Sequence, residues 1–175
     1  SLVRLQTLTD KVETSTIVDA AFRYLDKRVG EEVANMKKTE KKYKTLLFPM
    51  DELCDYLYSN ALAGRKTTPD INYLLDRLSK KPADLTIYGK ARTAVILQQY
   101  NKVEKAKEYL QNIKEYMVCT EEKGCYFDTK RAQYSWFDYK IPTEVAAIEA
   151  VKRITPNDEQ TLMNMQRWLL QEKRT

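Results

Sequence analysis

Side chains that could do chemistry gather between residues 119 and 144 of this 175-residue chain. The candidate acids are the carboxylates nearest the aromatic loop, Asp128, Asp138 and Glu144. Two carboxylates that face one cleft at a defined separation can hydrolyse a glycosidic bond. Acids also occur at the starts of helices for another reason, because they stabilise the positive end of the helix dipole. The sequence favours this second role, and we expect no catalytic residue.

Aromatic side chains in the same stretch could form a platform for a sugar or a peptide. They are Tyr126, Phe127, Tyr134, Trp136, Phe137 and Tyr139. A loop with this much apolar area is also expected to fold back and pack over helix ends, and we favour that interpretation. The candidate contact surface consists of Tyr126, Tyr134, Trp136 and Tyr139, with Trp136 and Tyr134 as the first choices for a ligand contact.

Two cysteines, Cys119 and Cys125, flank the segment Thr-Glu-Glu-Lys-Gly. In an oxidising compartment they could pair and close the base of a loop. If they stay reduced, both are expected to behave as small hydrophobic residues, as is Cys54 within its helix. The sequence leaves both alternatives open for this pair.

The composition excludes several classes of site. There is no histidine, which removes Ser-His-Asp and Cys-His nucleophiles. Three scattered cysteines cannot fill a structural zinc site alone, so we expect no metal and no cofactor. The net charge of +5 comes from 30 basic and 25 acidic residues with interspersed signs, which argues against a nucleic-acid interface. No apolar run is long enough to span a bilayer.

Helical periodicity recurs along most of the chain and predicts about seven helices. The first carries an apolar stripe of Ile17, Ala20, Ala21, Tyr24 and Leu25 and either continues past Gly30 or breaks there. The next are expected to start at Pro49, at Pro69 after the capping Thr68, after Pro82, at Val103, at Thr143 and near Asn157–Asp158. The helix from Val103 is expected to include Met117.

Residues 119–141 interrupt this pattern, and a small β-hairpin is expected around 124–139. In the helix 143–154, Ala146, Ala147, Ala150, Val151 and Ile154 form one stripe, while Val145 and Ile148 project from the other side. Apolar residues on both sides predict an inner helix of a two-layer array. We therefore expect an all-α fold of stacked antiparallel helical hairpins in a single domain, residues 1–175.

The second half of the chain resembles the toroid region of bacterial alpha-2-macroglobulin-like proteins. Three segments carry the resemblance: GCYF at 124–127, YSWFDYKIPTEVAAIEAVKRI at 134–154 and DEQTLMNMQRWLLQEKRT at 158–175. The matching residues are Gly124, Tyr126, Trp136, Ile141, Thr143, Glu144, Ala147, Trp168, Leu169, Leu170 and Lys173. The likeness is clearest over residues 84–175.

This resemblance implies part of an α/α toroid, related to the thioester domains of macroglobulins, within a larger multidomain protein. Members of the family are extracytoplasmic protease-trapping inhibitors, in the periplasm or at the cell surface. The implied partners are other domains of the same chain and target proteases, and the fragment itself is not expected to insert in a membrane or to bind nucleic acid.

The chain departs from the family at the thioester, which joins a cysteine to a glutamine three residues on. Neither Cys54, Cys119 nor Cys125 has that glutamine, so no reactive residue is carried over. Two alternatives remain. One is a glycan-binding or carbohydrate-active α/α toroid that uses the aromatic loop. The other is a peptide-binding helical repeat scaffold, suggested by the faint tetratricopeptide-like pattern of residues 88–110.

Overall fold

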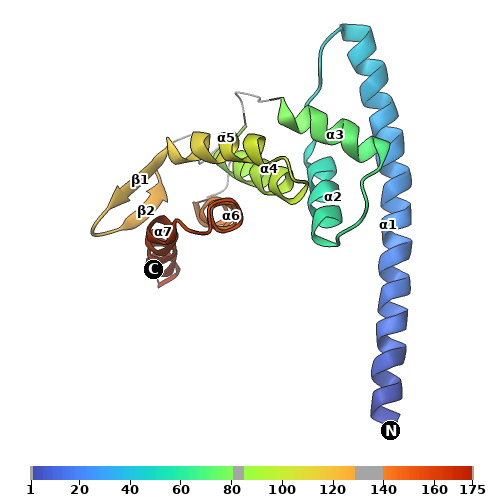
Figure 1. Ribbon diagram of the computed structural model, residues 1–175, viewed down its shortest axis with the longest axis horizontal. Coiled ribbons are helices and arrows are strands. Elements are labelled where there is room, and N and C mark those ends of the chain that lie inside the picture. Colours follow the sequence, from blue (N-terminus) through green and yellow to red (C-terminus); the bar gives the residue numbers. More distant parts are fainter. Residues whose placement is uncertain (1, 81–84, 129–139, 175) are drawn as a thin grey trace. The chain divides into compact units, whose positions relative to one another are not determined.

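The computed structural model describes residues 2–80, 85–128 and 140–174, with side chains from Asp10 onward in the first range. These ranges contain seven helices and one two-stranded antiparallel sheet (Figure 1). The elements are α1 (Leu2–Tyr43), α2 (Asp51–Leu62), α3 (Pro69–Ser79), α4 (Ile87–Gln99), α5 (Val103–Lys114), β1 (Met117–Thr120), β2 (Gly124–Phe127), α6 (Lys140–Ile154) and α7 (Glu159–Arg174). The prediction of a mostly helical chain with a small hairpin is confirmed, whereas the toroid stays a prediction.

The chain forms two compact units, residues 1–47 with 67–74 and residues 48–66 with 75–175. The boundary falls inside α3, between Leu74 and Leu75. The single domain expected from the sequence stays a prediction. Within the described residues no helix combines the length and the apolarity that crossing a membrane requires.

The first unit has one long helix that packs through its second half. The helix α1 runs through Gly30 without a break, and its buried side chains Val29, Val33 and Met36 recur every three or four residues. At its end the carboxylate of Glu40 accepts hydrogen bonds from the Tyr73 hydroxyl and from the backbone N–H of Leu47, at 2.9 Å for the latter. These contacts tie the start of α3 to the last turns of α1.

The apolar stripe predicted near the start of α1 is on the helix, but it is not buried. Ile17 is 69% exposed, Tyr24 61% and Leu25 38%. Periodicity identifies the face of a helix that can be buried, but it does not say that a partner is present. The predicted stripe is therefore present on one face of α1, and that face is exposed.

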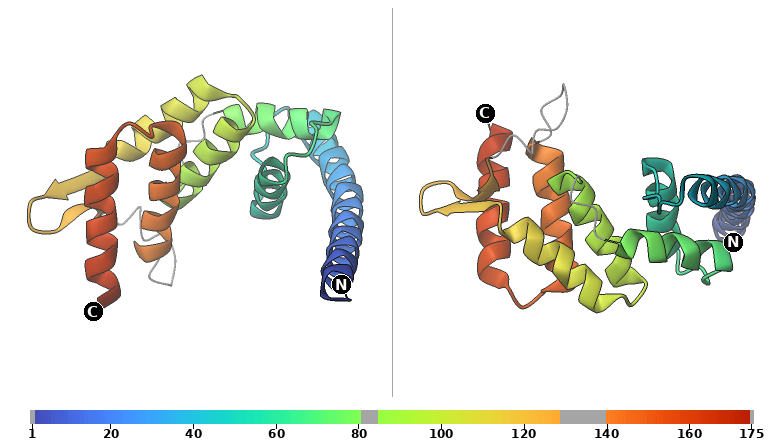
Figure 2. Two further views of the ribbon diagram at one scale, coloured as in Figure 1. Left: turned by 60° about the horizontal axis from the view of Figure 1, so that its bottom comes forward. Right: turned by 90° about the horizontal axis from the view of Figure 1, so that it is seen from above.

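The second unit is organised around α4, which packs against α2, α5 and α6. Consecutive residues Ala94–Leu97 are all buried, so this helix is enclosed on more than one side. Two antiparallel pairs are visible: α4 with α5, and α6 with α7 (Figure 2). The two pairs are joined by a 2.9 Å ion pair between Lys114 at the end of α5 and Asp158 before α7.

Several helix ends follow local sequence signals. The Thr68 hydroxyl accepts a hydrogen bond from the Ile71 N–H at 3.2 Å, with Pro69 in the first helical position as predicted. Asp158 caps α7 by accepting from the Thr161 N–H at 3.4 Å. At α2, Pro49 lies before the cap Met50 rather than in the helix.

Helix α6 begins at Lys140, three residues before the expected cap Thr143. Pro142 is tolerated there because N–H groups of the first turn have no partner within the helix. Thr143 is therefore a buried helical residue and not a cap. On the opposite side Val145 is exposed, so α6 is less enclosed than the inner helix predicted from its sequence.

The β-hairpin lies at residues 117–127, earlier than the predicted 124–139. Strand β2 pairs with the residues before it, in a register that sets Cys119 opposite Cys125 and Met117 opposite Phe127. Met117 therefore belongs to β1 and not to the preceding helix, which ends at Lys114. The second half of the predicted hairpin, residues 129–139, lies outside the described part of the chain.

Candidate functional site

Of the candidate contact surface, the structure describes Tyr126 alone, because Tyr134, Trp136 and Tyr139 lie outside the described residues. The Tyr126 ring stacks on Trp168 of α7, with ring centroids 5.9 Å apart and planes inclined by 9°. The Lys123 ammonium lies 5.9 Å from the centre of the Tyr126 ring. The Tyr126 ring is thus partly occupied by neighbouring side chains and is not a free platform.

The close approach of the hairpin to α7 depends on Gly124. A Cβ atom at this position would lie 2.3 Å from the backbone oxygen of Asn164, and the backbone has φ +85°. Arg167 of α7 also donates a hydrogen bond to the Thr120 carbonyl at 3.3 Å. Trp168 is only 5% exposed beneath this contact. The stack is therefore a packing joint between the hairpin and α7, while the packing interpretation of the aromatic run as a whole stays a prediction.

A cavity of about 350 Å³ borders the joint. Its lining residues are Glu122, Lys123, Tyr126, Phe127, Asp128, Lys140, Trp168, Gln171 and Glu172. Asp128 is the one candidate acid that lines it, since Glu144 is buried elsewhere on α6 and Asp138 lies outside the described residues. The described acids Asp128 and Glu144 therefore do not share this cavity.

Cys119 and Cys125 are joined by a disulfide in the structure, with their Cα atoms 4.1 Å apart. In the chain-entropy account, closing so short a loop stabilises the folded hairpin by about 2 kcal/mol. Cys54 is a different kind of residue. It is buried, and that burial raises the pKa of its thiol to about 11, so the reactive thiolate is scarce at neutral pH.

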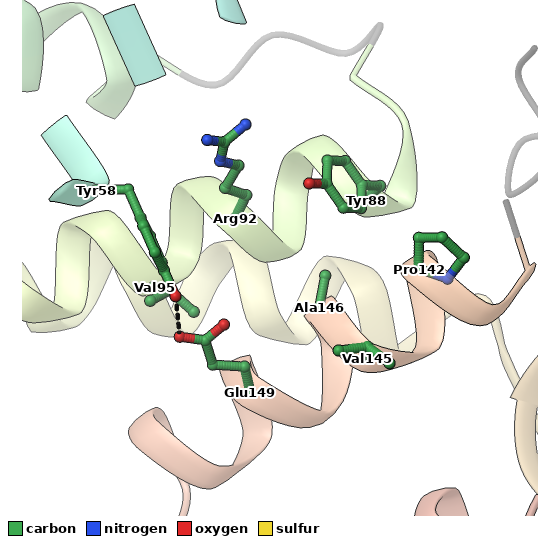
Figure 3. A pocket seen from close by; sticks show the side chains of 8 residues that line it. All are labelled: Tyr58, Tyr88, Arg92, Val95, Pro142, Val145, Ala146 and Glu149. Carbon is green, nitrogen blue, oxygen red and sulfur yellow. Dashed lines mark hydrogen bonds between the residues drawn. The ribbon is translucent and has the colours of Figure 1, made fainter. Parts of the chain in front are cut away.

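A second cavity, of about 300 Å³, lies among α2, α4 and α6 (Figure 3). It was not predicted from the sequence. It is lined by Tyr58, Tyr88, Arg92, Val95, Pro142, Val145, Ala146 and Glu149. The α6 members recur at helical spacing on the face opposite the buried stripe. The apolar Val145 on that face was the available signal, but its partners on α2 and α4 are far away in the sequence.

Hydrogen bonds and ion pairs organise the polar side of this cavity, which we call the α4–α6 cavity. The Tyr58 hydroxyl donates to Oε1 of Glu149 at 2.7 Å, and Nε of Arg153 donates to the same oxygen at 3.0 Å. Arg92 forms an ion pair with Asp55. Each described charge thus has an opposite partner, and the geometry suits an apolar or uncharged group better than an ion.

No reactive group is activated in the α4–α6 cavity. Burial, followed by the hydrogen bond to Glu149, raises the pKa of Tyr58, so its phenol stays protonated at neutral pH. The Arg92 guanidinium lies 5.9 Å from the centre of the same ring. A neutral phenol held between a carboxylate and a guanidinium can orient a bound group, but it is a poor nucleophile or base.

Glu144 is a buried acid of another kind. It is 1% exposed, and neither its carboxylate oxygens nor the adjacent Thr143 hydroxyl has a hydrogen-bond partner within the described part of the protein. Burial raises the pKa of Glu144 to about 8, which keeps the carboxyl largely uncharged at neutral pH. Protonation lowers the cost of burying this carboxyl, although its missing hydrogen bonds still cost stability.

Among the described residues, no three or more Cys, Asp or Glu side chains cluster in a way that could hold a metal ion. Comparisons with protein-family models, with curated proteins and with solved structures find no match to this chain.

Proposed function

We propose that this chain is the non-catalytic helical toroid portion of an extracytoplasmic alpha-2-macroglobulin-like protein, an endopeptidase inhibitor that traps proteases. It acts through its shape and through contacts with other domains of the same chain. The proposal starts from the resemblance of residues 124–127, 134–154 and 158–175 to bacterial members of that family.

The observation that carries the proposal is the role of the resembling residues in packing. Gly124 permits the contact of the hairpin with α7, and Tyr126 stacks on Trp168. Thr143, Glu144 and Ala147 are all buried on α6. Residues shared with a family for their packing support a shared architecture, and they carry no reactive chemistry with them.

The non-catalytic part of the proposal is supported by the state of the described side chains. Cys54 is buried with a raised thiol pKa, and Cys119 and Cys125 are joined to each other. The described acids near the aromatic run lie in different surroundings, with Asp128 exposed and Glu144 enclosed. A pair of carboxylates facing one substrate is the minimum for glycoside hydrolysis, and these two do not provide it.

Protease entrapment by the full-length parent protein tests the proposal. After addition of a protease of broad specificity, we expect cleavage of a large protein substrate to fall while cleavage of a small fluorogenic peptide persists. A trapped protease keeps its active site but is screened from large molecules. Protease that still digests the large substrate at its full rate would rule the proposal out.

A titration with oligosaccharides separates this proposal from the glycan-binding alternative. We expect no binding heat when the 175-residue chain is titrated in a calorimeter. A saturable heat that Trp136→Ala abolishes, and that the distant control Tyr43→Ala leaves intact, would favour the alternative instead.

A further inference from the structure

The N-terminal segment of α1, residues 10–28, exposes an apolar stripe that the rest of its unit does not cover. The stripe consists of Ile17, Val18, Ala21, Tyr24 and Leu25, which share one side of the helix at positions i, i+1, i+4, i+7 and i+8. Every described side chain from Asp10 to Ala21 is exposed. A contiguous apolar face of this kind on a helix surface marks an interaction site.

The stripe lies N-terminal to the part of α1 that packs within its own unit. The buried residues Val29, Val33 and Met36 begin where the stripe ends. An isolated helical segment of about this length is only marginally stable in water, because most helix stability in proteins comes from packing of an apolar face. A partner that supplies an apolar helix face would therefore stabilise residues 10–28.

The charges of the segment favour a second copy of the same segment as the partner, in an antiparallel orientation. Asp10, Lys11, Glu13 and Asp19 sum to a net charge of −2, whereas Arg23, Asp26, Lys27 and Arg28 sum to +2. A second copy laid antiparallel brings the negative half of each segment beside the positive half of the other. A parallel copy would place like-charged halves together, which is unfavourable.

We propose that residues 10–28 of α1 form a self-association surface on which the same segment of a second copy of this chain packs antiparallel. The stripe supplies the apolar contact, with the small Ala21 near its middle letting the two helices approach closely. The opposed net charges of the two halves fix the orientation. This inference is independent of protease trapping, so either can fail without the other.

Sedimentation equilibrium of the 175-residue chain over a range of concentrations tests the association. We expect a monomer–dimer equilibrium whose dissociation constant rises at least about a hundredfold in the variant Ile17→Ser with Leu25→Ser, because two apolar side chains are lost from each copy. The matched control is Met163→Ser with Leu170→Ser, two exposed apolar residues of α7, which should leave the dimer unchanged.

Circular dichroism and thermal unfolding of the same variants show whether a lost dimer reflects a lost contact or an unfolded chain. The stripe lies outside the buried residues, so both double variants should keep the unfolding midpoint of the second unit. A chain that stays monomeric at all concentrations overturns the proposal. So does a dimer that the Ile17→Ser, Leu25→Ser variant forms equally well.

Charge reversal tests the orientation. The variant Asp10→Lys with Glu13→Lys changes the first half to +2, and Lys27→Glu with Arg28→Glu changes the second half to −2. In an antiparallel dimer each change alone weakens association, and the four changes together restore it. In a parallel dimer neither change alone would matter, and that outcome would overturn the antiparallel arrangement. Added salt should reduce all of these effects.

Discussion

The first half of α1 and the helix α4 show that one helical pattern can have two outcomes. Both segments carry apolar residues at three- and four-residue spacing, yet Ile17 and Tyr24 of α1 are exposed while Ala94, Ile96 and Leu97 of α4 are buried. The difference lies in the rest of the surface of each helix. Helix α4 is apolar over most of its circumference and has neighbours α2, α5 and α6. The α1 segment has an apolar stripe beside a charged face, which suits a single partner.

Truncation of a side chain in each helix is expected to give the largest contrast. Leu97→Ala should lower the free energy of unfolding by about 2–5 kcal/mol, because it leaves a cavity around a residue with no exposed surface. Ile17→Ala should change it by less than about 0.5 kcal/mol at concentrations where the chain is monomeric. Urea unfolding followed by circular dichroism measures both. Equal losses for the two variants would mean that the α1 segment is also enclosed.

A buried and an exposed acid extend the comparison to pH. The pKa of Glu144 is raised by burial to about 8 from the usual 4.5, so the folded chain holds this proton more tightly than the unfolded chain. The contribution of Glu144 to the free energy of unfolding is therefore greatest below about pH 4.5, and it falls as the pH rises to about 8. The total change is of the order of a few kcal/mol.

The variant Glu144→Gln removes this titration. We expect its stability to stay flat between pH 5 and pH 8 and to exceed that of the wild type at pH 8, measured by urea unfolding at each pH. Glu13→Gln in the exposed segment of α1 is the matched control and should follow the wild-type profile. A wild-type stability that rises with pH across this window would contradict the buried, uncharged carboxyl.

Two glycines distinguish a crowded position from an open one. Gly124→Ala should destabilise by at least about 2 kcal/mol, because its Cβ would meet the Asn164 oxygen at 2.3 Å and the residue has a positive φ. Gly30→Ala should stabilise by about 0.5–1 kcal/mol, since alanine is the better helix former and the nearest atom to its Cβ, Oδ2 of Asp70, lies at 3.5 Å. Thermal unfolding gives both signs. Stabilisation by Gly124→Ala would show that β2 does not press on α7.

Reduction of the disulfide should have the smallest effect on stability among the four changes predicted here. We expect loss of the Cys119–Cys125 bond to cost about 2 kcal/mol or less, because the closed loop is short. The double variant Cys119→Ser with Cys125→Ser should unfold at the same lower temperature with and without reductant. Since α4 is far from the hairpin in the sequence and packs on other helices, protection of its amides from hydrogen exchange should not change.

Local signals in the sequence predicted much of the helical fold. Two helix starts are marked by caps that accept hydrogen bonds from nearby N–H groups: Thr68, followed by Pro69, and Asp158. Each cap and its partner lie within a few residues, so the local sequence is enough to predict them. The predicted start of the hairpin was wrong, because Met117 continues the apolar spacing of α5. Periodicity alone does not distinguish the last turn of a helix from a short strand.

Contacts between distant residues were beyond sequence reasoning. The hydrogen bond between Tyr58 and Glu149 joins residues 91 positions apart, and nothing near either residue predicts the other. The exposure of the α1 stripe was missed for a related reason, since it depends on which molecule covers that face. The sequence singles out Tyr126 as part of an aromatic run, but nothing near Tyr126 predicts that its ring stacks on Trp168.

The position of Trp168 beneath Tyr126 provides a built-in optical probe. The chain has two tryptophans, so replacing Trp136 by phenylalanine would leave one indole, held almost dry at the contact of the hairpin with α7. Detachment of the hairpin from α7 would expose that indole to water and shift its fluorescence to longer wavelength. Emission spectra could then follow the opening of this corner of the protein in real time, separately from the melting of its helices.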